Sequence, residues 1–272
     1  MDNTPASFDG RMTPTHAAQP LRGVLPRWLL DVVLTLVIGF ALMTLAGLMW
    51  GVLTGVRSAL QGANADAVGA AIASPGALAQ IGMVLLASAT TALLIYVWRQ
   101  PATSAERRYA YQQMRRPQTW ALSIATAVAL FAGTTLVTWL LHTWGMAPSP
   151  ANLAVIRAAL AQSPIFVVLF TVVAAPLYEE LLFRRVLFGR LWKAGRPVLG
   201  MWLSGFAFAL SHEVPGLGQG PLAATLCLVL VYAAMGASFA WLYKKTGSLW
   251  AAVLAHAVNN ALALFVLLVS GP

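Results

Sequence analysis

Long apolar runs, each bounded by charged or turn-forming residues, divide most of this chain into segments long enough to cross a membrane. A transmembrane helix needs about 20 predominantly apolar residues to span the hydrocarbon core of a bilayer. We expect spans at 28–54, 77–98, 119–142, from Pro164 into the Glu179-Glu180 region, 198–212, 221–243 and 248–269. The pattern therefore predicts an all-α fold, a polytopic transmembrane helical bundle of seven spans.

Two segments leave the number of spans open between seven and eight. The run 198–212 is short for a span, and the Gly- and Ala-rich segment 62–74 is a weak candidate for an eighth. The first 27 residues are polar and contain four prolines, so we expect a flexible cytoplasmic tail over 1–27. We assign the N-terminal transmembrane helices to 28–158 and a C-terminal transmembrane core to 159–272.

The composition excludes a soluble protein and a disordered one. The 272 residues are 59% hydrophobic and only 9% charged, whereas a soluble domain carries about 25% charged residues. The apolar stretch that starts near Trp28 exceeds the roughly 7–15 residues of a signal peptide's apolar region, so we interpret it as an uncleaved span. The only cysteine, Cys227, excludes an intrachain disulfide.

The net charge of +9 is explained by membrane orientation. With the N-terminus in the cytoplasm, all of the 17 Lys and Arg residues except Arg57 and Arg157 fall on the cytoplasmic side. Such an excess follows the positive-inside rule. We therefore expect a multi-pass protein of the cell (plasma or inner) membrane with a cytoplasmic N-terminus, and no nucleic-acid partner.

Three groups of polar residues interrupt the C-terminal apolar runs, where polar groups are costly and usually functional. In the first, Glu180 and Arg184 are four residues apart and can pair on one helix face, which leaves Glu179 free as a general base. In the second, His212 follows Phe208 at the end of an apolar helix. A zincin motif fails here, because His-Glu-x-x-His would need a histidine where Gly216 stands.

The third group lies in the last span, where His256 and Asn260 project from the same helix face. An asparagine so placed can fix a histidine tautomer or donate a hydrogen bond to an oxyanion. Simpler interpretations exist for all three groups: charges at a membrane interface, a structural histidine, and polar contacts between helices. Their combination on three helices of one bundle favours a site that holds and activates one water for attack on a carbonyl.

The order Glu-Glu-x-x-x-Arg, Phe-x-x-x-His, His-x-x-x-Asn resembles the motif set of the CPBP intramembrane proteases, also called the Abi or type II CAAX prenyl endopeptidase-like family. The resemblance covers about 160 to 265, and residues 1–150 add only compatible spans. It implies a helical membrane bundle whose cavity opens towards the cytoplasm, with 159–272 as the catalytic core.

The resemblance also implies a role for each residue. Glu179 would activate the water with help from His212, and His256 with Asn260 would stabilise the oxyanion. Glu180 and Arg184 would order the first helix, and Phe208 would pack against the site. The family has been described as both metalloprotease and glutamic protease, and Glu179, His212 and His256 would be the ligands if zinc were bound. We favour a metal-free site, because asparagine is a poor zinc ligand.

Helix lengths raise one difficulty. At about 1.5 Å per residue, Glu179 lies roughly 22 Å below the outer start of its helix. His256 lies roughly 12 Å above the inner start of its own helix. In a hydrocarbon core about 30 Å thick, these two positions are at similar depths. Counted from Val198, however, His212 lies roughly 21 Å from the inner side, which is too high. We therefore expect 185–197 to form an amphipathic segment in the inner leaflet, the alternative being a re-entrant Gly- and Pro-rich loop after His212.

The motifs and the resemblance predict an intramembrane endopeptidase that cleaves a peptide bond near the cytoplasmic face. Its partners would be the lipid bilayer and a peptide or protein substrate that could carry a lipid, and CAAX cleavage is one option for that substrate. Two other functions use the same residues: a non-catalytic membrane scaffold or peptide-binding immunity protein of the same family, and a transporter. The transporter lacks its main sequence cue, since the chain shows no convincing internal repeat.

Overall fold

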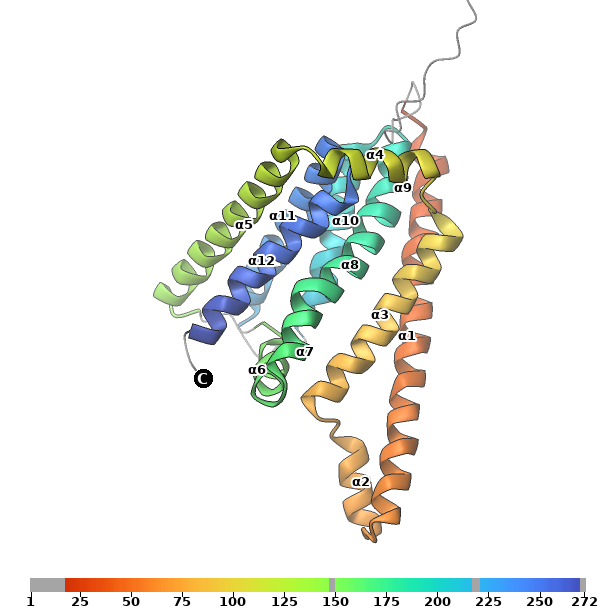
Figure 1. The fold of residues 1–272 in the computed structure, drawn as a ribbon, viewed down its shortest axis with the longest axis vertical. Helices are drawn as coiled ribbons and strands as arrows, with labels where there is room; N and C mark the ends of the chain where they lie inside the picture. Colours follow the sequence, from red (N-terminus) through yellow and green to blue (C-terminus); the bar gives the residue numbers. More distant parts are fainter. Residues whose placement is uncertain (1–17, 147–149, 217–220, 270–272) are drawn as a thin grey trace, which may run out of the picture.

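The computed structural model describes residues 18–146, 150–216 and 221–269, which form helices joined by short loops and no β-strand (Figure 1). The helices and the two π-helical segments, η1 and η2, are α1 (Leu21–Leu60), α2 (Ala65–Ala73), α3 (Ala77–Arg99), α4 (Ser104–Met114), α5 (Pro117–Thr143), α6 (Leu153–Gln162), α7 (Pro164–Val168), η1 (Leu169–Ala174), α8 (Ala175–Glu179), η2 (Glu180–Phe188), α9 (Gly189–Lys193), α10 (Pro197–His212), α11 (Leu222–Thr246) and α12 (Leu249–Val269). The prediction of an all-α polytopic bundle is confirmed.

Six helical stretches in the described part of the chain are long and apolar enough to cross a membrane. They are α1, α3, α5, the continuous run Pro164–Lys193, α11 and α12. The remaining predicted span, 198–212, corresponds to α10, whose 16 residues are fewer than a full crossing needs. The candidate eighth span corresponds to α2, whose 9 residues extend only about 14 Å.

The run Pro164–Lys193 carries the first motif and departs from regular α-helix twice. Pro176 explains the first departure, because proline has no N–H and its ring clashes with the carbonyl four residues earlier. The turns just before it, in η1, widen to π-helical geometry. The second π-helical segment, η2, begins at Glu180 itself.

The expectation for 185–197 is wrong. Residues 185–193 continue the same helical run as η2 and α9, and α10 follows after a short turn at Pro197. The side chains of this part are largely buried: Leu191 is fully enclosed, and Phe188 stacks on Trp192. The segment packs inside the bundle because its apolar residues find partners there, whereas the amphipathic interpretation assumed a lipid interface on one side.

A close crossing of α10 and α11 sets the position of the second motif. A Cβ atom on Gly205 would lie 2.5 Å from the carbonyl oxygen of Ala233, and one on Gly236 would lie 2.7 Å from the Cα atom of Gly205. No side chain fits at either position, so the two backbones touch. This contact brings Phe208 and His212, one turn and two turns further along α10, against α11.

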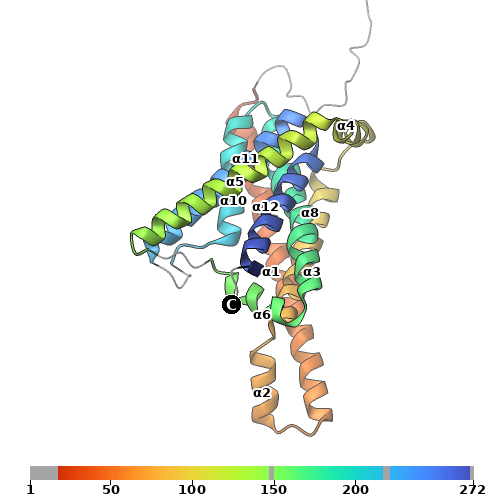
Figure 2. The same cartoon turned by 60° about the vertical axis from the view of Figure 1, so that its left-hand side comes forward.

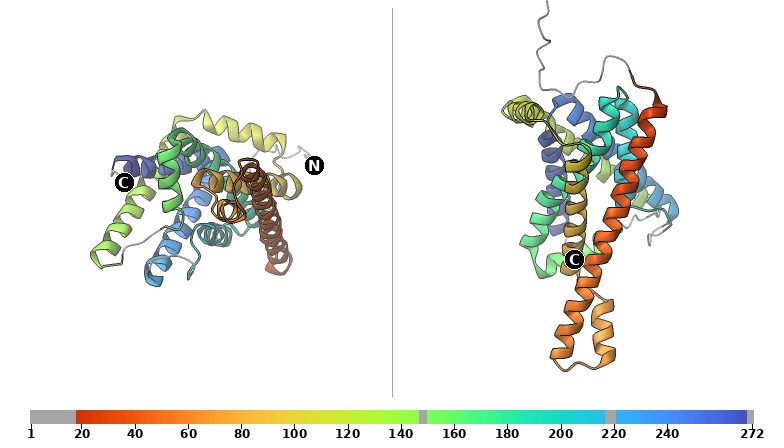
Figure 3. Two further views of the ribbon diagram at one scale, coloured as in Figure 1. Left: turned by 90° about the horizontal axis from the view of Figure 1, so that it is seen from below. Right: turned by 90° about the vertical axis from the view of Figure 1, so that its right-hand side faces the viewer.

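The N-terminal helices contribute less to the core. Only Val24, Trp28 and Asp31 are buried along the 40 residues of α1, a few others are partly buried against the core, and many apolar side chains of the helix are exposed. Beyond the bundle, α1 and α2 form a projecting hairpin (Figures 2 and 3). The predicted tail 1–27 lies mainly outside the described residues, and helix α1 begins within it at Leu21.

Candidate active site

Three of the predicted site residues meet between α8, α10 and α12. The Nε2 atom of His212 lies 3.7 Å from Oε2 of Glu179, and the Nε2 atom of His256 lies 3.8 Å from the same oxygen. This carboxylate oxygen is buried and has no hydrogen-bond partner among the described residues. The two distances exceed a direct hydrogen bond, and they leave one carboxylate oxygen facing two imidazole nitrogens.

The partners of the other ring nitrogens fix the tautomer of each histidine. In His212, Nδ1 lies 2.9 Å from the carbonyl oxygen of Phe208, which can only accept, so Nδ1 carries the hydrogen. In His256, Nδ1 lies 2.8 Å from Oε1 of Glu180 and donates to that carboxylate. When each ring is neutral, its Nε2 lone pair is therefore directed to the space beside Glu179.

Glu180 links two other residues of the site, Arg184 and His256. It is fully buried and pairs with Arg184 at 2.9 Å, as the four-residue spacing predicts. The same carboxylate accepts from His256, a contact that sequence spacing alone did not indicate. Glu180 thus joins the first motif to the third, and it orients the imidazole whose other nitrogen faces Glu179.

Aromatic rings enclose these polar groups. Phe208 lies 4.4 Å from the ring of His212 and 5.7 Å from that of His256, and the guanidinium of Arg184 lies 4.6 Å above its face. Phe239 stacks on His256 at 5.0 Å, and Tyr232 lies 5.2 Å from His212. The role of Phe208 in packing follows the prediction. Nothing distinguishes Phe239 and Tyr232 from the other apolar residues of α11 in the sequence, so they were missed.

Asn260 is placed differently from the other motif residues. Its Nδ2 atom donates to the carbonyl oxygen of Thr171 in η1 at 2.9 Å. In the π-helical register, where Ala175 donates to Phe170, the next amide would serve Thr171, but that residue is Pro176. The Asn260 side chain therefore satisfies a carbonyl that proline leaves without a backbone donor. The structure records no contact between Asn260 and Glu179, and its oxyanion role stays a prediction.

Glu179, His212 and His256 are the candidate zinc ligands. Catalytic zinc sites have three protein ligands about 2.0–2.3 Å from the metal and keep a fourth position open for water. Within the described residues, no group of three or more His, Cys, Asp or Glu side chains is arranged to hold a metal ion. The preference for a metal-free site stays a prediction.

Comparisons with known proteins find similarity in the C-terminal region. A family model described as type II CAAX prenyl endopeptidase Rce1-like matches residues 161–262. A protein of Bacillus subtilis (strain 168), described as "Putative membrane peptidase YdiL", is 27% identical over 119 residues. That match spans 44% of this chain and 44% of the length of the relative. No solved structure matches the chain.

The matched segment contains all three polar motifs and the helices that bring them together, from η1 to α12. The N-terminal helices α1 to α5 lie outside it. Residues 161–262 of this multi-pass membrane protein are thus similar to the Rce1-like type II CAAX prenyl endopeptidases.

Proposed function

We propose that this protein is an intramembrane endopeptidase that hydrolyses a peptide bond with a water activated by Glu179 and His212. The observation that carries the proposal is the position of Glu179 Oε2, buried without a hydrogen bond and 3.7 and 3.8 Å from two histidine nitrogens. A water between these three acceptors can donate both of its hydrogens and direct a lone pair at a carbonyl carbon. The family match supports a peptidase over the transporter alternative.

The reaction then follows from the roles of the acceptors. The water oxygen bonds to the carbonyl carbon while Glu179 takes one of its protons, as a general base does. The carbonyl oxygen becomes an oxyanion, which the amide N–H of Asn260 would stabilise; His256 would join it as a donor once its Nε2 also carries a proton. When the carbon–nitrogen bond breaks, Glu179 returns the proton to the departing amine, and the carboxylate is regenerated.

Glu180 and Arg184 support this chemistry without touching the substrate. Because Glu180 accepts from Nδ1 of His256, the Nε2 atom of that ring remains turned towards the reacting atoms. Phe208 and Phe239 pack against the ring of His256 and limit its movement. Such support by surrounding groups keeps reacting groups near their productive geometry.

The charge distribution supports an orientation for the site. The helix ends that carry Arg99, Lys193 and Lys244 lie at the same end of the bundle as α4 (Figure 1). By the positive-inside rule this end faces the cytoplasm of a cell (plasma or inner) membrane. The substrate would be a membrane-associated peptide or protein, which could be lipidated as CAAX proteins are.

The test is mass spectrometry of membrane peptides from cells that make the wild-type protein or a variant. We expect new peptide termini with wild type that are absent with Glu179→Ala and with His212→Ala, each lowering turnover by at least about 10²-fold. Full activity in either variant overturns the proposal. Wild type that cleaves no peptide but still binds one would favour the scaffold. Activity that survives a chelator would exclude an essential, exchangeable metal.

A further inference from the structure

A cavity lined partly by η2 lies apart from the polar centre. It is a cavity of about 410 Å³, within the range of small-molecule sites. Helix α4 borders one end, and side chains of α8, η2 and α12 form its walls. Neither Glu179 nor either histidine of the candidate active site lines it. Its occupant is therefore a separate question from the proposed peptidase reaction.

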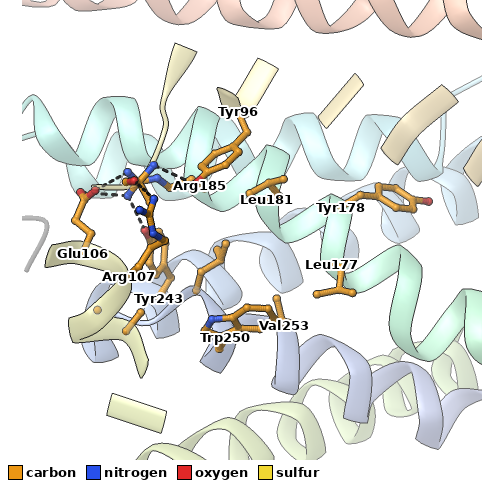
Figure 4. A pocket seen from close by; sticks show the side chains of 14 residues that line it. Tyr96, Glu106, Arg107, Leu177, Tyr178, Leu181, Arg185, Tyr243, Trp250 and Val253 are labelled. Carbon is orange, nitrogen blue, oxygen red and sulfur yellow. Dashed lines mark hydrogen bonds and ion pairs between the residues drawn. The ribbon is translucent and has the colours of Figure 1, made fainter. Parts of the chain in front are cut away.

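The cavity has one charged end and one apolar end. Figure 4 shows Glu106, Arg107 and Arg185 gathered at one end, with Leu177 and Val253 towards the other. At the rim, Leu177 and Trp250 are 38% and 53% exposed on helices that belong to candidate membrane spans. A hollow of this shape, open beside membrane-spanning helices, suits a molecule with a charged head and an apolar chain.

At the polar end of the cavity, Arg107 is the cation without an acidic partner among the described residues. Arg185 binds Glu106 at 2.7 Å and also donates to the carbonyl oxygen of Pro101, while Lys193 lies 3.7 Å from Glu106. Glu106 is thus neutralised within the protein. Among the described residues, Arg107 bonds to the Ala102 carbonyl and, at 3.2 Å, to the Ser104 hydroxyl, and to no other group.

Arg107 forms no ion pair in the described part of the chain, and its side chain is exposed at the cavity. The polar end therefore carries a net positive charge. Helix α4 adds Arg108, and Arg115 and Arg116 follow at its end, with Glu106 as its one acid. Basic pockets between transmembrane helices on the cytoplasmic side are a recognised way to bind anionic lipid headgroups.

We propose that this cavity binds an anionic membrane phospholipid, with its phosphate at Arg107 and one acyl chain between α8 and α12. The guanidinium of Arg107 has donors left for two phosphate oxygens. Leu177, Leu181 and Val253 offer the chain an apolar surface. Tyr178 lines the cavity and also interacts with the Glu179 carboxylate, so the bound lipid would lie next to the candidate active site.

The test uses the full-length protein in detergent, stripped of lipid, and native mass spectrometry. Phosphatidylglycerol and phosphatidylcholine with identical chains are added separately at equal concentrations. We expect one phosphatidylglycerol to bind roughly fivefold more tightly than phosphatidylcholine, the size expected for one interfacial arginine. Equal binding of the two lipids overturns the proposal.

Three variants locate the site. Arg107→Gln should reduce phosphatidylglycerol binding to the phosphatidylcholine level, whereas Arg108→Gln, on the next residue but outside the cavity lining, should not. Val253→Trp should fill the apolar end and weaken both lipids. Equal losses with Arg107→Gln and Arg108→Gln would indicate a general basic surface and reject the site. Melting temperatures equal to wild type show that each variant is folded.

A photoactivatable phosphatidylglycerol with its reactive group in the acyl chain gives an independent position. Crosslinks to peptides from α8 and α12 support the proposed orientation, and crosslinks confined to α1 or α5 overturn it. A lipidated peptide added in excess tests the other amphiphile that the cavity could hold. If such a peptide binds while phosphatidylglycerol does not, the cavity serves a substrate chain. Because all readouts are of binding, they can fail while the peptidase proposal stands.

Discussion

The bundle contains two buried groupings of acids and arginines, and they differ in how completely their oxygens are paired. In the first, between α1, α3 and α9, Asp31 is fully buried, with one oxygen bound to Arg99 at 2.6 Å and the other to Arg190. In the second, Glu180 has an ion pair with Arg184 and a bond from His256, whereas among the described residues the neighbouring Glu179 has a buried oxygen with neither a hydrogen bond nor an arginine partner.

This difference separates a structural role from a chemical one. An isolated buried charge is costly, so an acid in a membrane bundle is normally neutralised by partners. Asp31 meets that rule and fastens α1, which has few other buried residues, to the rest of the bundle. Glu179 violates the rule at one oxygen, beside two histidines. Unsatisfied groups of this kind in a folded protein call for an explanation, and catalysis supplies one.

The largest effect should come from exchanging the two acids for their amides. Glu179→Gln keeps the size of the side chain but cannot take a proton from water, so turnover should fall by about 10²- to 10⁴-fold with little change in melting temperature. Asp31→Asn is the matched control, because it removes a buried acid outside the site. Rates per folded molecule, measured on a peptide found in wild-type membranes, check both. Equal losses of rate in the two variants would remove the distinction.

Glu180→Gln should lower both stability and turnover, since Glu180 pairs with the buried Arg184 and also holds His256 of the candidate site. It leaves the fully buried Arg184 without its counter-charge, which costs about 3 kcal/mol of stability. It also weakens the acceptor that holds His256, and turnover should fall about tenfold, as for lost outer support. Thermal unfolding in detergent and the peptide assay measure the two effects. A variant with wild-type stability would show that the ion pair contributes little.

Asp31→Asn should destabilise the protein less, by about 2 kcal/mol. The general cost of removing one partner from a buried ion pair is roughly 3–5 kcal/mol, but Arg99 and Arg190 are 21% and 14% exposed and can turn towards water or headgroups. Limited proteolysis should cut α1 first, because this cluster supplies much of its attachment. Unchanged proteolysis of α1 would contradict that role.

Much of this architecture could be predicted from the sequence, including the ends of several helices. The runs 77–98 and 248–269 match α3 and α12 almost to the residue, because apolar length and a charged or small boundary residue are sufficient signals. The short helix α4 was missed although Thr103 and Glu106 form a capping box, a signal that can be read in sequence. Its sequence is polar and lacks the apolar run that identifies a membrane span.

The candidate site was predictable in its members and less so in its contacts. Spacing gave the Glu180–Arg184 pair, because residues four apart lie on one face. Spacing could not give the bond from His256 to Glu180, since it depends on how two distant helices pack. The contact of Asn260 with Thr171 depends in addition on the π-helical turns before Pro176, and such turns have no simple sequence signature.

The smallest effect concerns a third acid–arginine group, in which the acid, Glu106 of α4, lies outside the candidate spans. Burial alone would raise the pKa of Glu106, but hydrogen bonds from Arg185 and the Thr103 backbone, with the charges of Arg185 and Lys193, hold it below the usual 4.5. A carboxyl with a lowered pKa in the folded state stabilises the protein above its unfolded pKa, and this contribution is lost as the pH falls through the folded pKa.

Glu106→Gln should therefore lower stability by about 1 kcal/mol at neutral pH. The difference from wild type should stay constant down to about pH 4.5 and shrink below it, because the wild-type carboxylate then becomes protonated. Melting temperatures of both proteins across pH 3–7 measure this difference, in which other titrating groups cancel. If the stability difference persists undiminished at pH 3, the shape of the Glu106 side chain, rather than its charge, anchors α4 to the bundle.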